Sequence, residues 1–270
     1  SPINPNLKDR YVMKKDFSID ALYRLFIYLT LFIIAVSILV PVAWVIFASL
    51  KENREFYENP WKLPAGLNFK NFKDAWESAH MGSYFLNSVT VTALSLIILL
   101  ATAIPSSYAL SRFSFKGRGF LRGIFMAGLF INVSYLVIPI FLMLVDLNSL
   151  IGSPLLLNNH FVLAVVYAST ALPFTVYLLS GYFSSLPREY EESAYVDGAS
   201  HFRTMVSIMA PMARPAIITV ILFNFLSFWN EYIIAITLMT DEGAKTLPVG
   251  LMNLMKAQNA AAQYGKMYAG

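Results

Sequence analysis

Residues 25–50 read LFIYLTLFIIAVSILVPVAWVIFASL and contain no charged side chain. A helix of roughly 20 apolar residues crosses the hydrocarbon core of a bilayer, which is about 30 Å thick. The stretch begins directly after Arg24 and ends directly before Lys51, so charged residues mark both of its ends. It therefore predicts a first transmembrane helix over 25–50.

Four further stretches repeat this pattern, at 78–111, 123–145, 160–183 and 215–239, and only the last contains a charge, Glu231. The composition agrees, because 57% of the residues are hydrophobic and 13% are charged, whereas soluble domains carry about 25% charged residues. We predict an all-α membrane protein, a polytopic helical bundle with five visible spans. Apolar residues gather again at 267–270, so that either a sixth span is expected after them or the tail is external.

The charges between the spans predict how the bundle is oriented. Residues 111–122 contain four bases and no acid, whereas the stretch that follows Asp146 is free of bases. Basic loops stay in the cytoplasm. We therefore predict a multi-pass inner-membrane protein with a cytoplasmic N-terminal segment (1–24) and a periplasmic segment (51–84) after the first span.

The sequence lacks the motifs that are typical of several classes of enzyme and metal-binding protein. The sequence has no cysteine, and its three histidines, His80, His160 and His201, lie in different segments, so a metal site is not predicted. Neither a nucleophile elbow nor a phosphate-binding loop is present. We expect no catalytic residue, no metal and no cofactor in this chain, and no partnership with nucleic acid.

The cytoplasmic segment 184–214 has the sequence pattern of two short helices. Ser185 can cap the first, Gly198 can end it and Ser200 can cap the second. Three acids, Glu189, Glu191 and Glu192, fall in the first helix. Anionic lipid would repel them, so docking to a protein partner is favoured over a position on the membrane surface.

Glu192-Ser193-Ala194, followed by Gly198, Ile208 and Pro211, resembles the motif EAA-x3-G-x9-I-x-L-P of permease subunits in binding-protein-dependent ABC importers. Ser193 and Ala210 depart from it. Two more stretches, 107–113 (SYALSRF) and 228–232 (FWNEY), look like the MalG-like permease of carbohydrate importers. The resemblance implies the type I permease fold, with a permease core over 85–270.

In this family the motif forms a coupling helix that sits in a cleft of a cytoplasmic ATPase subunit. Carried over, the coupling residues are Glu192, Ser193, Ala194, Asp197, Gly198 and Ala199. The implied partners are a homologous MalF-like permease, two ATP-binding subunits that bind ATP and Mg, a periplasmic solute-binding protein and the lipid membrane. The resemblance also implies that the external loop meets the binding protein through Thr246, Gly250, Gln258 and Asn259.

Asn224, Ser227 and Glu231 recur at helical spacing in the fifth stretch, flanked by Trp229, Asn230 and Tyr232. An ionisable residue inside a span is a functional candidate, and these six residues are the predicted translocation path. A hydrogen-bond network between helices is an equally good interpretation. Further polar groups fit either role: Asn87, Asn132, Ser134, Tyr135, Thr170 and Tyr177.

The sequence thus favours a transmembrane permease subunit of an ATP-driven importer. It would move a sugar or oligosaccharide from a periplasmic binding protein into the cytoplasm by alternating access. The alternative is a secondary transporter or channel that uses the polar path around Glu231 without an ATPase. No Lys or Arg lies within a span, so nothing in this chain favours an anionic sugar.

Overall fold

The computed structural model describes residues 5–78 and 80–270. Every regular element in these ranges is a helix. The chain divides into two compact units, the first formed by Ser1–Ala75 and Met255–Gly270 and the second by Trp76–Leu254.

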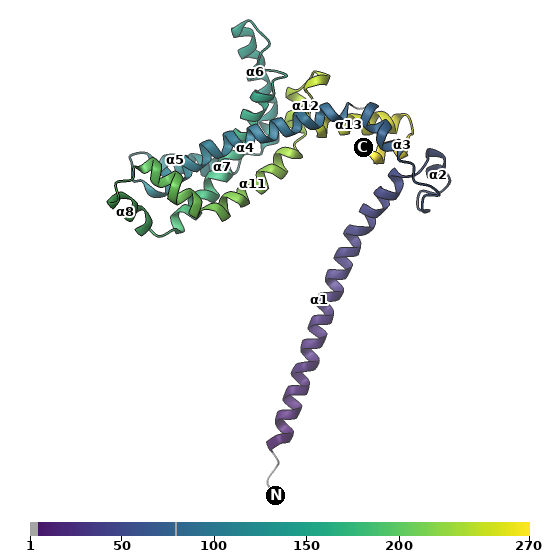
Figure 1. The fold of residues 1–270 in the computed structure, drawn as a ribbon, viewed down its shortest axis with the longest axis horizontal. Coiled ribbons are helices and arrows are strands. Elements are labelled where there is room, and N and C mark those ends of the chain that lie inside the picture. Colours follow the sequence, from purple (N-terminus) through teal and green to yellow (C-terminus); the bar gives the residue numbers. More distant parts are fainter. Residues whose placement is uncertain (1–4, 79) are drawn as a thin grey trace. The chain divides into compact units, whose positions relative to one another are not determined.

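The first unit contains the long helix α1 (Pro5–Ser49), α2 (Asn53–Glu58), most of α3 (Lys70–Ser78) and α14 (Tyr264–Ala269). Residues 20–49 of α1 are apolar enough to cross a membrane, and the helix runs without a break through Pro41 (Figure 1). Trp44 of α1 meets Tyr268 of α14 with ring centroids 5.2 Å apart. The buried Lys51 donates to the carbonyl of Pro60 at 2.7 Å, so the segment after α1 is held by its own polar contacts.

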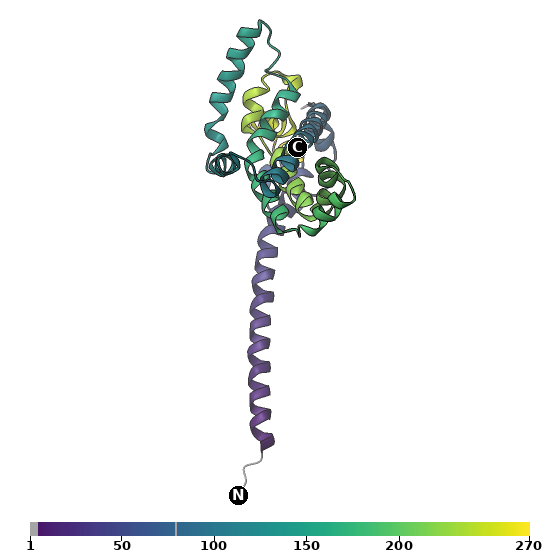
Figure 2. The same cartoon turned by 90° about the vertical axis from the view of Figure 1, so that its left-hand side faces the viewer.

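The second unit is built around α4 (Met81–Arg112) and α7 (His160–Ser185), which pack along each other (Figures 1 and 2). Both are long and apolar enough to span a membrane. Their contact contains buried small polar residues, because the Ser107 hydroxyl donates to the Val176 carbonyl at 3.4 Å and the Ser180 hydroxyl to the Ser107 carbonyl at 3.5 Å. Small residues let membrane helices approach closely, which explains how two helices with internal prolines, Pro105 and Pro173, pack tightly.

The third predicted span is not one helix. It is divided into α5 (Arg118–Gly128), the short η1 (Val133–Tyr135) and α6 (Val137–Ile151), and Figure 1 shows α6 turned away from α5. The helix α5 ends at Gly128, and Asn132 caps the start of η1, where its side chain accepts the Ser134 N–H at 2.9 Å. Pro139 falls in the first turn of α6, where its missing N–H removes no helical bond.

The fifth predicted span is also interrupted. It consists of α11 (Arg214–Trp229) and α12 (Ile233–Leu238), separated by residues 230–232. By length and hydropathy the described residues contain three helices able to cross a membrane. A fourth arises if the segments His201–Met212 and Arg214–Trp229, which meet at 77°, count as one span. The apolar stretches were thus located correctly, but two of them were wrongly predicted to be continuous helices.

The remaining helices of the second unit are short. They are α8 (Glu189–Val196), α9 (His201–Thr204), the π-helix η2 (Met205–Met209), α10 (Ala210–Met212) and η3 (Glu242–Ala244). The helix α13 (Leu247–Ala260) begins in the second unit and ends in the first. The core of the second unit centres on Leu99, Leu163, Leu179 and Val220, all with side chains fully buried.

Candidate functional site

The segment after α7 forms the two short helices that the sequence predicts. Gly198 separates α8 from α9 with φ of +79°, a conformation that glycine adopts without strain. The Ala199 N–H donates to the Ala194 carbonyl at 2.9 Å, and Ser200 caps α9 by accepting from the Arg203 N–H. The predicted cap at Ser185 is wrong, because its hydroxyl donates to the Tyr182 carbonyl within α7.

The helix α8 has an outer and an inner face. Glu192, Ser193 and Asp197 are exposed, whereas Glu191 and Ala194 are 7% and 4% exposed. Of the predicted coupling residues, Ala194 therefore packs against the protein, whereas the carboxylates of Glu192 and Asp197 face outward. A partner protein could reach Glu192 and Asp197 without disturbing the core.

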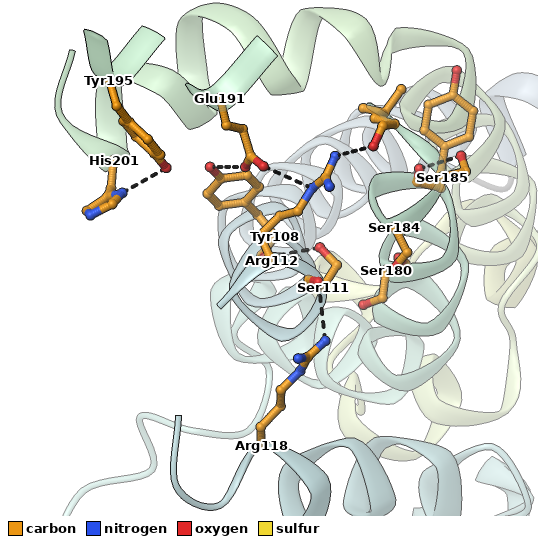
Figure 3. Close-up of polar contacts among 12 residues, drawn as sticks. Tyr108, Ser111, Arg112, Arg118, Ser180, Ser184, Ser185, Glu191, Tyr195 and His201 are labelled. Atoms are coloured by element: carbon orange, nitrogen blue, oxygen red, sulfur yellow. Dashed lines mark hydrogen bonds and ion pairs between the residues drawn. The ribbon is translucent and has the colours of Figure 1, made fainter. Parts of the chain in front are cut away.

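Glu191 occupies the inner face and is not among the predicted site residues. Its Oε1 accepts a 2.6 Å hydrogen bond from the Tyr108 hydroxyl of α4. The Arg112 Nε lies 3.4 Å from Oε2, an ion-pair distance outside hydrogen-bond geometry. Figure 3 shows the Glu191 carboxylate between Tyr108 and Arg112. Helical spacing puts Tyr108 and Arg112 on one face of α4, and Glu191 and Ala194 on one face of α8, but it does not indicate that these two faces meet.

Arg112 also holds the segment that leads into α8. Its Nη2 donates to the Leu186 carbonyl at 2.7 Å, just after the end of α7. A second arginine, Arg118, donates to the carbonyls of Leu110 and Ser111 at 2.9 and 3.2 Å. These carbonyls belong to the last turn of α4, where cationic side chains satisfy unpaired acceptors. The end of α4 is thus fixed by two guanidinium groups (Figure 3).

A second feature is a cavity of about 400 Å³ between η1, α7, α11 and α12. It gathers three of the six predicted path residues, Asn224, Ser227 and Glu231, together with Ser134 and Thr170. The other three do not line it: Trp229, Asn230 and Tyr232. Trp229 instead stacks on Phe225 with centroids 5.7 Å apart.

Glu231 has a structural partner for each oxygen. Oε1 accepts from the Ile234 N–H at 2.9 Å, and Oε2 accepts from the Ala235 N–H at 3.1 Å and from the Tyr167 hydroxyl at 2.9 Å. The carboxylate therefore caps the first turn of α12 while also lining the cavity. Asn224 donates to Thr175 Oγ1 at 3.2 Å and so joins α11 to α7.

The loop around η3 is attached to α4 and α7. Asn87 donates to the carbonyls of Gly243 and Lys245, both at 2.9 Å, and His160 Nε2 lies 2.9 Å from the Ala244 carbonyl. The Glu242 carboxylate pairs with Lys245 and accepts from the Tyr84 hydroxyl at 2.9 Å. These two donors, first the Lys245 ammonium and then the Tyr84 hydroxyl, hold the pKa of the Glu242 carboxyl below its ordinary value.

The predicted contact with a binding protein divides between the two units. Thr246 is 3% exposed, and a Cβ on Gly250 would lie 2.1 Å from the Tyr84 ring. Both residues therefore have a packing role in the second unit. In the first unit Asn259 is exposed and Gln258 half-buried, so a surface for a partner is better offered by these two.

Among the described residues no group of three or more His, Asp or Glu side chains is arranged to hold a metal ion.

Residues 101–269 match the family described as binding-protein-dependent transport system inner membrane component. The chain belongs to this family. It is a multi-pass inner-membrane permease component, a transport subunit and not an enzyme.

Similar proteins agree with this membership. The diacetylchitobiose uptake system permease protein NgcG of Streptomyces coelicolor is 35% identical over 87% of this chain and 76% of the relative. The probable ABC transporter permease protein YurM of Bacillus subtilis is 34% identical over 90% of this chain and 78% of the relative. The trehalose/maltose transport system permease protein MalG of Thermococcus litoralis is 30% identical, with coverages of 86% and 81%.

A solved structure has the same fold. The crystal structure of a bacterial ABC transporter involved in the import of the acidic polysaccharide alginate aligns with a TM-score of 0.77 and 22% identity. The alignment covers 100% of this chain and 92% of that one. The type I permease fold expected from the sequence is thereby confirmed.

Proposed function

We propose that this chain is one permease half of an ATP-driven importer of neutral sugars. It would pair with a homologous permease, two cytoplasmic ATPase subunits that bind ATP and Mg, and an external solute-binding protein. The N-terminus lies in the cytoplasm in this proposal, together with the basic loop 111–122 and the helix α8.

The outward face of α8 is the observation that carries the proposal. Glu192 and Asp197 are exposed on a short helix whose other face is anchored to α4. A transport step driven by a separate ATPase needs a rigid element that an ATPase can push, and a packed helix transmits a displacement that a flexible loop would absorb. Family membership makes an ATPase partner the expected occupant of this face.

The cavity supports a neutral substrate more than the relatives do. The relatives include permeases for diacetylchitobiose and for trehalose/maltose, whereas the solved structure with the same fold is of an importer of the acidic polysaccharide alginate. The cavity beside Glu231 is lined by aliphatic and aromatic side chains with hydroxyl groups and one amide, and its one charged lining residue is an acid. A carboxylate at that point would repel an anionic sugar, whereas hydroxyl and amide groups can replace water on a neutral one.

Charge reversal on α8 tests the proposal. The importer, purified with its partner subunits and placed in proteoliposomes with ATP inside, would be compared with Glu192→Arg/Asp197→Arg. The same change at the exposed Asp20 is the control. We expect the double variant to lose ATPase co-purification and uptake of labelled diacetylchitobiose or maltose, and the control to keep both.

Uptake that continues without ATP, or a double variant that still binds the ATPase and transports normally, would overturn the proposal. A uronic acid disaccharide serves as the anionic comparator. Faster uptake of this acid than of either neutral sugar would contradict the substrate class. The secondary transporter considered above would be recognised by uptake that depends on a proton gradient and not on ATP.

A further inference from the structure

The connection between α8 and the rest of the second unit has two parts. The first is backbone, because residues 186–188 join α8 to α7 and residues 197–200 join it to α9, where Tyr195 Oη also lies 2.9 Å from His201 Nδ1. The second part leads directly to α4 and consists of side chains, because the Glu191 carboxylate contacts Tyr108 and Arg112. Without these side-chain contacts, a displacement of α8 could be absorbed by the connecting segments and not reach α4.

Arg112 reinforces both parts. Its Nη2 binds the Leu186 carbonyl at the start of the connecting segment, and its Nε pairs with Glu191 at the far side of that segment. The Arg112 and Glu191 side chains are 4% and 9% exposed. In a site so poorly hydrated the attraction between the two charges is weakly screened, so the contact resists being pulled apart.

The other end of α4 contacts the loop that carries η3. Tyr84 binds Glu242, and Asn87 binds the carbonyls of Gly243 and Lys245. A single helix of 32 residues, about 48 Å long at 1.5 Å per residue, therefore contains both the anchor of α8 and the contacts with that loop. A displacement passed from α8 to α4 would reach residues far from the ATPase.

We infer that Glu191 is a positioning residue that fastens the coupling helix to α4, so that a push on α8 moves α4 and is not absorbed by the connecting segments 186–188 and 197–200. The inference rests on the proposed function. Glu191 does not itself contact the ATPase in this mechanism, because it lies on the inner face of α8. Its role is to keep ATP hydrolysis tied to transport.

The first test is Glu191→Gln in the complete importer, which removes the charge and keeps the shape. The matched control is Glu189→Gln, the same change at an exposed position of the same helix. Changes along a coupling network alter coupling by about two- to thirtyfold. We expect the amount of sugar moved per ATP hydrolysed to fall about tenfold in Glu191→Gln, with ATPase co-purification and ATP hydrolysis retained and the control unchanged.

The absence of cysteine allows a rescue experiment. In Arg112→Cys/Glu191→Cys, with cysteine-free partner subunits, a short reagent that joins two thiols would restore a covalent link between α4 and α8. We expect the unlinked variant to be uncoupled and the linked one to regain at least half of the wild-type ratio. A merely structural loss would not be repaired by linking already assembled protein, and the single variant Glu191→Cys with the same reagent controls for modification alone.

The inference is overturned if Glu191→Gln moves as much sugar per ATP as wild type. It is also overturned if the double variant stays uncoupled after the link between α4 and α8 has been confirmed. If Glu191→Gln does not assemble, the result with the linked double variant is the test. The proposed function fails separately, when the wild-type complex itself shows no ATP-dependent uptake.

Discussion

Glu231 is held by donors from two helices, and this placement gives its carboxylate a structural task beside the cavity. Two of its three bonds come from the backbone N–H groups of Ile234 and Ala235 and one from the Tyr167 hydroxyl. Acidic side chains at the start of a helix satisfy N–H groups that have no intrahelical partner. The residue therefore allows α12 to begin after the break at 230–232.

Replacing Glu231 with Gln should lower the stability of the folded protein more than it lowers the rate of transport. An amide offers one oxygen where the carboxylate offers two, so at least one donor loses its partner, at a cost of about 1–3 kcal/mol. We expect a lower thermal unfolding temperature of the detergent-solubilised protein and ATP-dependent uptake that is retained per folded molecule. Ser227→Ala, in the same cavity, should leave the unfolding temperature nearly unchanged. Uptake that becomes insensitive to a proton gradient only in the Gln variant would support a proton relay instead.

Single residues of the site could be predicted where polar residues recur at helical spacing in the sequence. The spacing of Asn224, Ser227 and Glu231 indicated one polar face, and the cavity contains all three. The aromatic neighbour Trp229 could be placed only in part: its stacking on Phe225, four residues earlier on α11, follows helical spacing, whereas its contact with Phe85 depends on how α4 and α11 pack. Glu191 escaped for a related reason, since its partners come from a helix more than 75 residues earlier in the chain.

At the scale of elements, hydropathy located the apolar stretches but not the breaks within them. At both breaks an asparagine side chain binds a nearby backbone group, Asn132 at the Ser134 N–H and Asn230 at the Leu226 carbonyl. Such local bonds compete with helix continuation. A count of apolar residues contains no information on that competition, whereas the glycine at 198 and the serine at 200 are local signals and marked the end of α8 and the start of α9 correctly.

The loop around η3 should respond to pH through Glu242. The lowered pKa of this carboxyl means that the folded loop favours the charged form, so its stabilisation is present above the ordinary value of 4.5 and is lost as the pH falls through the lowered pKa. We expect the extra protection of amides 241–250 from hydrogen exchange, relative to Glu242→Gln, to be constant from pH 5 to pH 8 and to disappear in stronger acid. Protection that rises as the pH falls below 4.5 would contradict this sign.

On the scale of the whole molecule, the two units have different relations to the proposed transport cycle. The second unit contains the anchored α8, the cavity beside Glu231 and the η3 loop, so it holds all the predicted coupling and path residues. Of the predicted contacts with a binding protein, Gln258 and Asn259 lie in the first unit. The first unit has its own aromatic cluster, in which Phe56 stacks on Tyr264 at 4.9 Å. Coupling can therefore be tested in the complete importer by substitutions in the second unit alone, and these tests do not depend on where α1 lies.

The orientation of the second unit is open to a direct test because the protein has no cysteine. Cytoplasmic loops of membrane proteins are rich in Lys and Arg, and the loop 111–122 that follows α4 carries four bases. In the proposed orientation Val196 of α8, which is 87% exposed, faces the cytoplasm, and the exposed Asp241 before η3 faces the outside. A membrane-impermeant thiol reagent should label Asp241→Cys in intact spheroplasts and Val196→Cys only in inside-out vesicles. The reverse pattern would put α8 outside, out of reach of any cytoplasmic ATPase.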